Sequence, residues 1–217
     1  MLDFSDHTRT GISKLISRCA PIFLHSLIFL SFLPDLSFVT FRTVWRIAIE
    51  SYGLPRYSEV CQLTVSDITW TDIGFDIFIK KSKTDQTCKG NWVAIARQPT
   101  SPFCSVVLTR KYLSVLNYAS GFIMPSTKNS VPDSSSPLPY NTALRDLRQV
   151  LTQIGIDPKG FGEHSGHRGG TTAAAAQGAT LDELMIKGRW RSESMPRLYT
   201  DNAKKLKRKF ARRLPNF

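Results

Sequence analysis

The chain has 217 residues, of which 41% are hydrophobic and 21% charged, so it can form a core and is too weakly charged to be fully disordered. It carries 29 Lys and Arg residues against 17 Asp and Glu residues, a formal net charge of +12. Such an excess costs self-repulsion unless a polyanion is near, so it favours nucleic acid or an acidic membrane as the partner.

The four cysteines, Cys19, Cys61, Cys88 and Cys104, include no C-x-x-C pair, and only four histidines accompany them. This spacing argues against a zinc site and predicts reduced thiols in a protein of the cytosol or nucleus. We therefore expect neither a metal nor another cofactor.

An apolar run occupies residues 20–33 and follows Arg9, Lys14 and Arg18. This is the outline of a signal peptide, but no small-residue cleavage site clearly follows it. The run is also shorter than the roughly 20 residues that a membrane span needs. We favour a leader or a buried helix over secretion or membrane anchoring, and we expect residues 1–40 to lie outside the core.

Helical and strand patterns alternate through the middle of the chain. Apolar spacing predicts helices at 41–52, 56–63 and 106–118, whereas alternation of apolar and polar residues predicts strands at 67–70, 75–79 and 91–97. The polar stretch SKTDQTCKG predicts a hairpin between the last two strands. A segment rich in Ser and Pro, residues 125–139, is expected to be a loop.

Helices return after this segment. Leu144, Leu147, Leu151 and Ile154 form one apolar stripe, and an alanine-rich helix is expected over 171–177. Thr180 and Glu183 form a capping box for a last predicted helix, which Gly188 ends. The expected fold is α+β and mostly α, with a small antiparallel sheet near its N-terminal side.

Histidines, an arginine and a tyrosine in the second half of the chain suggest phosphodiester chemistry. His164, His167 and Arg168 precede a glycine pair, Trp190 follows a helix end, and Tyr199 comes nine residues later. A tyrosine phenol ordinarily has a pKa of about 10. Neighbouring cations would lower this pKa and stabilise a charged phosphorane.

The segment HSGHRGGTTAAAAQGATLDELMIKGRWRSESMPRLY, residues 164–199, resembles the signature end of the tyrosine recombinase (phage integrase) family, which has H-x-x-R, then His or Trp, then a nucleophilic Tyr. The intervals of 26 residues from His164 to Trp190 and nine from Trp190 to Tyr199 are usual for that family. Upstream, GLPRYSEVCQLTVSDI (53–68) resembles its first-arginine motif, and KKSKTDQ (80–86) resembles its lysine hairpin. The GRW and SKTDQ details are similar to Crypton-type recombinases of eukaryotic mobile elements. The resemblance implies an integrase-type catalytic domain over residues 41–217.

The resemblance also implies roles for the upstream residues. Arg56 would hold a non-bridging oxygen of the scissile phosphate, and the alternative is a surface arginine paired with Glu59. Lys83 would protonate the leaving 5′ oxygen as general acid. The hairpin offers three alternative lysines for that role: Lys80, Lys81 and Lys89.

The downstream residues would complete the site. His164 would assist Tyr199 or orient the phosphate, and Tyr199 would attack phosphorus to form a 3′-phosphotyrosyl link. Trp190 would stand where a second histidine is common and donate its indole N–H. A structural histidine, a core tryptophan and a buried tyrosine are the plain alternatives.

One position departs from the family pattern. The second arginine would fall at position 167, which is His167, and the adjacent Arg168 points about 100° away on a helix. Histidine lacks the guanidinium fork, so the second phosphate clamp is weakened. We expect His167 to face the Arg56 pocket and Arg168 to point elsewhere, contributing to DNA binding. A catalytically dead DNA-binding relative is therefore the main alternative to an active recombinase.

The C-terminal tail is strongly basic. Residues 187–217 hold eleven Lys and Arg residues, and KKLKRKFARR (204–213) includes the expected DNA contacts Lys204, Lys205, Lys207 and Arg208. The same run could serve nuclear import, or it could be a solvated basic helix. We expect double-stranded DNA as the partner, self-association on DNA, and a nuclear location in a eukaryote or a cytoplasmic one otherwise. Residues 1–40 are too short for the DNA-clamp domain that precedes the catalytic domain in family members, so the chain looks like a truncated mobile-element copy.

Overall fold

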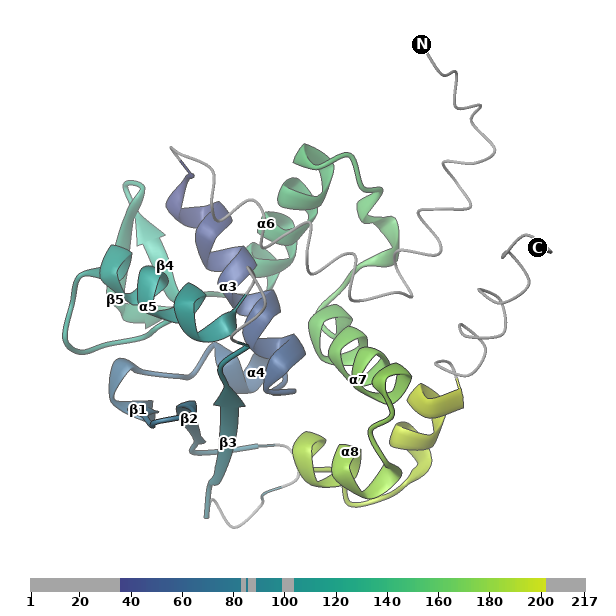
Figure 1. Cartoon of the computed structure of the whole chain (residues 1–217). Coiled ribbons are helices and arrows are strands. Elements are labelled where there is room, and N and C mark those ends of the chain that lie inside the picture. Colours follow the sequence, from purple (N-terminus) through teal and green to yellow (C-terminus); the bar gives the residue numbers. More distant parts are fainter. Residues whose placement is uncertain (1–35, 83–84, 86–88, 99–103, 202–217) are drawn as a thin grey trace.

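The structure is a computed structural model that describes residues 36–82, 85, 89–98 and 104–201 (Figure 1). Its longer helices are α3 (Phe38–Tyr52), α5 (Ser105–Leu116), α6 (Tyr140–Gln153), α7 (Ser165–Gln177) and α8 (Leu181–Gly188), and α4 (Tyr57–Val60) is a single turn. The strands are β1 (Ile68–Trp70), β2 (Gly74–Ile79), β3 (Asn91–Ala96), β4 (Pro125–Lys128) and β5 (Val131–Pro137). Short 3-10 turns lie at Val65–Asp67 and Pro158–Gly160. The fold is α+β and mostly helical, as the sequence predicts.

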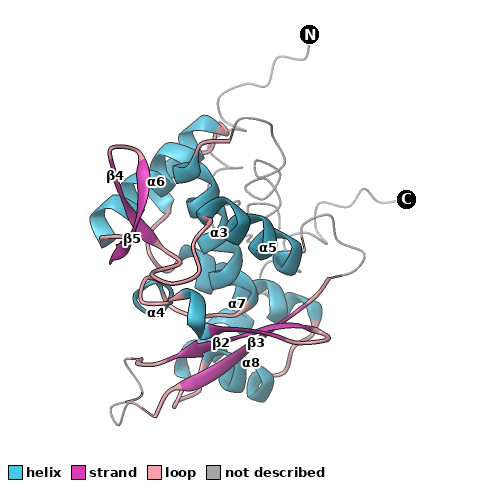
Figure 2. Ribbon diagram, turned by 90° about the vertical axis from the view of Figure 1, so that its left-hand side faces the viewer, coloured by secondary structure: helices cyan, strands magenta, loops and turns pink. Residues whose placement is uncertain are grey.

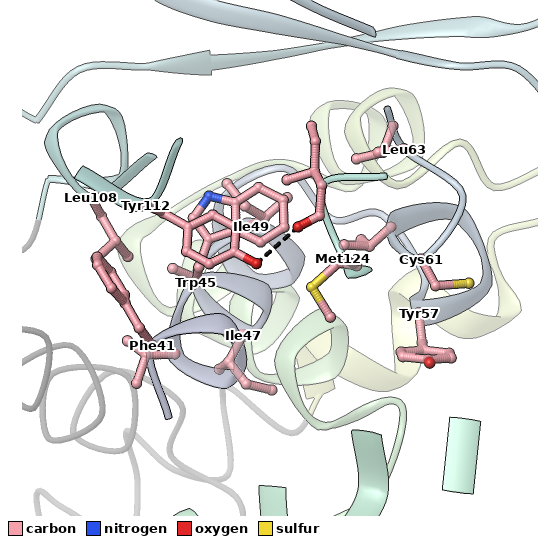
Figure 3. Close-up of a cluster of buried hydrophobic side chains, with 14 of the residues drawn as sticks. Phe41, Trp45, Ile47, Ile49, Tyr57, Cys61, Leu63, Leu108, Tyr112 and Met124 are labelled. Atoms are coloured by element: carbon pink, nitrogen blue, oxygen red, sulfur yellow. Dashed lines mark hydrogen bonds between the residues drawn. The ribbon is translucent and has the colours of Figure 1, made fainter. Parts of the chain in front are cut away.

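Helix α3 runs through the centre of the domain, and α5, α6 and α7 pack around it (Figure 1). Ser37 caps its N-terminus by accepting a hydrogen bond from the backbone N–H of Thr40. Trp45 stacks on Tyr112 of α5 at a centroid distance of 4.8 Å (Figure 3). The buried Tyr112 hydroxyl donates to the Ile123 carbonyl oxygen at 2.8 Å, so its polar atom is satisfied.

Strands β1, β2 and β3 form an antiparallel sheet in that order, beside the helices (Figure 2). Ile77 at its centre pairs with Ile68 on β1 and with Val93 on β3. Phe75, Ile77 and Ile79 are buried on one face, which confirms the predicted alternation.

The composition of segment 125–139 predicted a loop, and this prediction is wrong. The segment contains an antiparallel hairpin of β4 and β5. Lys128 pairs with Val131, and Asn129 and Ser130 between them have positive φ angles of 52° and 64°. Two consecutive left-handed residues make a tight turn whose twist matches that of a hairpin, and Asn tolerates this conformation well.

The expected start of the helical core at residue 41 is also wrong, because α3 begins at Phe38. Leu36 and Phe38 are partly buried and pack against the core, so these residues belong to the domain. The apolar run at 20–33 lies outside the described residues. In the described part of the chain, no helix is both long and apolar enough to cross a membrane.

Helix α7 begins at Ser165, well before the alanine-rich stretch where a helix was expected. Its glycines are packing residues, because a Cβ at Gly170 would lie 2.1 Å from the Ser51 carbonyl oxygen and one at Gly166 would lie 2.5 Å from Glu50 Oε2. This close approach sets the N-terminal turns of α7 against the C-terminal end of α3. The residues His164 to Arg168 are thereby brought beside the turn that leads to Arg56.

Candidate active site

Arg56 lies at the N-cap of α4, directly after a turn in which Leu54 adopts a positive φ of 55°. Its Nη1 atom donates to Oε1 of the buried Glu59 at 2.9 Å, and its backbone N–H donates to Oε2 at 2.8 Å. The expected pairing with Glu59 is thus present. It leaves the other guanidinium N–H groups of Arg56 without a partner among the described residues, and 15% of the side chain is exposed.

The Glu59 carboxylate also holds a second arginine, which the sequence did not single out. Arg189 follows α8 with a positive φ of 54°, and its Nη2 atom lies 2.6 Å from Glu59 Oε2. The same guanidinium donates to the carbonyl oxygens of Leu54 and Lys187, each at 3.3 Å. The left-handed conformation that directs Arg189 inward has no signal in the sequence, since glycine is the usual residue there.

His167 is buried, with 5% of its surface exposed, and lies near Arg56 as expected. Its Nδ1 atom lies 2.9 Å from the Leu54 carbonyl oxygen, so Nδ1 carries the proton and donates it. Burial, followed by the charge of Arg56, lowers the pKa of His167 to about 4. The imidazole is therefore neutral at pH 7 and supplies no positive charge to the site.

A row of aromatic rings links His167 to Tyr199. The Trp190 ring lies 5.2 Å from the His167 ring, edge to face, and 5.8 Å from the Tyr199 ring. Gly188 makes room for Trp190, because a Cβ at this position would lie 2.2 Å from the indole. Tyr199 itself is 3% exposed and sits on a final helix that begins at residue 194.

Opposing effects act on the Tyr199 phenol. Burial raises its pKa, whereas the positive charges of Arg168 and then Arg56 lower it. Arg168 is exposed on α7, yet its charge acts on Tyr199 more strongly than that of Arg56. Arg168 is thus exposed, as expected, and also close enough to Tyr199 for its charge to act on the phenol.

The structure brings together most of the candidate residues that it describes. His164 occupies the N-cap position of α7, is exposed, and lies close enough to His167 for its charge to affect the pKa of that imidazole. Arg56, His164, His167, Trp190 and Tyr199 thus gather on one side of the domain. Their catalytic roles remain predictions.

The basic residues expected on the hairpin and in the tail are only partly described. Lys83 and the tail residues Lys204, Lys205, Lys207 and Arg208 lie outside the described residues. The alternative hairpin lysine Lys80 lies 2.8 Å from Asp67 Oδ1 and 3.3 Å from the Thr64 hydroxyl. Its ammonium is thus engaged in an ion pair, whereas Lys81 and Lys89 are exposed.

A hollow of about 490 Å³ lies between α3, α7 and α8, lined by residues that include Tyr52, Leu54, Ala174, Leu184 and Ile186. None of the candidate catalytic residues lines it. Within the part of the chain that the structure describes, no group of His, Cys, Asp and Glu side chains could hold a metal ion.

Comparisons with known proteins find similarity to recombinases. The chain is 28% identical over 149 residues to an integrase/recombinase xerD homolog from Selenomonas ruminantium, covering 69% of this chain and 44% of the relative. The chain is a relative of the tyrosine recombinases. No family model matches it.

Solved recombinases share the fold. The crystal structure of XerA recombinase matches with a TM-score of 0.64 at 18% identity, over 89% of this chain and 62% of XerA. The post-cleavage complex of XerH site-specific recombinase with a palindromic difH substrate matches with a TM-score of 0.62 at 19% identity, over 87% of this chain and 50% of XerH. The chain therefore spans 44% of the length of the curated relative and 50% to 62% of the length of these two solved recombinases.

Proposed function

We propose that this chain is the catalytic domain of a DNA recombinase that cuts and rejoins double-stranded DNA through Tyr199. The observation that carries the proposal is the convergence of Arg56, His164, Trp190 and Tyr199 beside one another, in a chain related to recombinases. XerH, which shares the fold, has been captured on a DNA substrate before and after cleavage. The net charge of +12 suits the same partner.

The proposed reaction is a transesterification. The Tyr199 oxygen attacks phosphorus and loses its proton to His164, while the bond between phosphorus and the 5′ oxygen breaks and Lys83 protonates that oxygen. Arg56 stabilises the charge of the phosphorane through its free N–H groups. One phosphate ester replaces another, so the step reverses without a metal or a nucleotide.

A second candidate function, DNA binding without cleavage, is favoured by one specific observation. His167 is neutral and bonded to the Leu54 carbonyl oxygen, so position 167 offers the phosphate no cation. Binding draws on many cations and would survive this loss, whereas transition-state stabilisation depends on a few placed donors.

A trapping assay separates the two functions. The substrates are duplexes with a randomised centre in which sulfur replaces the bridging 5′ oxygen. The thiolate leaves without a general acid and attacks the phosphotyrosine poorly, so a covalent adduct accumulates. The recombinase proposal predicts a covalent adduct that is absent with Tyr199→Phe. Retention of the duplexes without any adduct would support the binding function instead.

Three further features of the proposal rest on the sequence pattern. We propose that the protein associates with further copies of itself on DNA and that it derives from a mobile element. The basic run at 204–213 would direct it to the nucleus in a eukaryotic cell. Localisation of a fluorescent fusion, with and without Lys204, Lys205, Lys207 and Arg208, tests the last of these.

A further inference from the structure

The scissile phosphate carries negative charge that increases in the phosphorane, so the number of free cations beside Tyr199 matters. Three arginines among the described residues act on the pKa of His167 or Tyr199: Arg56, Arg168 and Arg189. They differ sharply in how many of their N–H groups are already bonded. This difference identifies the arginine that is able to receive a phosphate oxygen together with Arg56.

Arg189 is not available for a phosphate. Its guanidinium donates to Glu59 and to the carbonyl oxygens of Leu54 and Lys187, and only 9% of its side chain is exposed. Phosphate binding would require it to give up its contact with the buried Glu59 carboxylate, and loss of a buried ion-pair partner is costly. Arg189 therefore has a structural role: it connects the end of α8 to the turn that precedes Arg56 and to Glu59.

His167 is not available either. Its donor, Nδ1–H, is bonded to the Leu54 carbonyl oxygen, and its ring makes an edge-to-face contact with the Trp190 ring. The remaining ring nitrogen of the neutral imidazole is an acceptor and would repel a phosphate oxygen.

Arg168 has the opposite properties. It is exposed, and its guanidinium has no hydrogen bond or ion pair within the described part of the chain. Its backbone N–H donates to the His164 carbonyl oxygen at 2.8 Å, so Arg168 lies one helical turn after His164 on the same face of α7. The first turn of this helix also presents N–H groups whose partial charge favours an anion.

We propose that Arg168, in place of residue 167, is the second arginine that contacts the scissile phosphate beside Tyr199. The proposal rests on the proposed recombinase function and names the residue that fills a role in the same site. The effect of Arg168 on the Tyr199 phenol, which exceeds that of Arg56, supports this placement. The phosphate would then lie between Arg56 on one side and Arg168 on the other, with His164 one turn away.

The decisive experiment compares Arg168→Gln with the matched control Arg148→Gln, which removes an exposed arginine from α6 that has no side-chain partner among the described residues. We expect Arg168→Gln to lower Tyr199 adduct formation on the phosphorothiolate duplexes by about a hundred-fold. Arg148→Gln should change it little, and Arg168→Lys should restore part of it because the charge returns without the fork.

Duplexes with a methylphosphonate at the cleaved position distinguish phosphate contact from a purely structural role of Arg168. A methyl group replaces one charged oxygen, so there is less charge for Arg168 to neutralise, and the penalty of Arg168→Gln should shrink on this substrate. An equal penalty on both substrates would overturn the inference. Adduct formation that is unchanged in Arg168→Gln but rises about a hundred-fold in His167→Arg would overturn it as well.

A measurement without DNA separates failure of this inference from failure of the proposed function. The Tyr199 pKa can be followed by NMR of ¹³C-labelled tyrosine, with Tyr199→Phe to assign the signal. Arg168→Gln should raise this pKa and Arg148→Gln should not. An unchanged pKa would place Arg168 too far from Tyr199 and overturn the inference, whereas a wild-type protein that forms no adduct at all would overturn the proposed function.

Discussion

Arg189 Nη2 and Glu59 Oε2 lie 2.6 Å apart, although 130 residues separate them along the chain. Through this contact a single buried carboxylate joins the end of α8 to the turn that presents Arg56. The local architecture of the candidate site therefore depends on a residue that would not itself contact the substrate.

Removal of this carboxylate should be more harmful than removal of either arginine. Glu59→Ala leaves Arg56 and Arg189 without the carboxylate that both contact. Loss of one partner of a buried ion pair lowers the free energy of unfolding by about 3–5 kcal/mol. We expect chemical denaturation to show a loss of this size. A change of less than about 1 kcal/mol, the value usual for surface pairs, would contradict the proposed role of Glu59.

Arg56→Ala should separate activity from stability. Glu59 retains Arg189 in this variant, so the fold should be kept, while loss of a placed phosphate donor should reduce adduct formation by about a hundred- to a thousand-fold. The two readouts are adduct yield and the denaturation midpoint. A variant that keeps wild-type adduct yield would show that Arg56 serves only as a partner of Glu59.

His167 should make stability depend on pH. Its pKa is about 4 in the folded protein and 6.5 when unperturbed, so the unfolded chain takes up a proton first as the pH falls. The stabilising contribution is therefore present above pH 6.5 and is lost between that pH and 4, by about 3 kcal/mol in total.

The buried Glu50 acts in the opposite direction. Its pKa is raised from 4.5 to about 7, chiefly by burial, so its contribution to stability grows as the pH falls from 7 to 4.5. Denaturation of His167→Gln and Glu50→Gln at several pH values isolates the two effects. Relative to wild type, His167→Gln should become more stable with acidification, and Glu50→Gln should become less stable.

Substitution of Lys83 and of Lys80 should affect cleavage of two substrates differently. Lys83→Ala should reduce cleavage of ordinary duplexes but not of 5′-bridging phosphorothiolate duplexes, because a thiolate leaves without a proton. Lys80→Ala removes the ion pair with Asp67 and should affect both substrates alike. Rescue of Lys80→Ala by the sulfur substrate, with none for Lys83→Ala, would exchange the two assignments.

The basic tail should contribute mainly to affinity. Replacement of Lys204, Lys205, Lys207 and Arg208 by Ala should lower the slope of log K against log salt by roughly 3–4 if all four contact phosphates. Fluorescence anisotropy with duplex DNA over a salt series measures this slope. An unchanged slope would exclude the tail from the interface.

Much of the fold could be predicted because apolar periodicity survives in the sequence. The alternation of Phe75, Ile77 and Ile79 identified a strand, and the box of Thr180 and Glu183 marked the start of α8. The hairpin of β4 and β5 was missed because its strands are rich in Ser and Pro, and its Asn129–Ser130 turn lacks the glycine that usually marks such turns.

The candidate site residues were predicted from their order and spacing, whereas features that depend on tertiary contacts could not be predicted. The glycine pair was interpreted as preceding a helix, whereas Gly170 lies inside α7 where it meets Ser51. Arg189 escaped notice because its inward direction depends on a left-handed backbone after α8. The direction of Arg168 relative to Tyr199 depends on the final helix, whose placement no local pattern encodes.

Mass spectrometry of the covalent adduct identifies the nucleophile directly. After incubation with the phosphorothiolate duplexes, nuclease and protease digestion followed by mass spectrometry locates the nucleotide on the protein. If Tyr199 is the nucleophile, a 3′-phosphate ester should be found on the peptide that contains Tyr199, and Tyr199→Phe should form no adduct. A nucleotide on another residue, or an adduct that persists in Tyr199→Phe, would contradict this assignment.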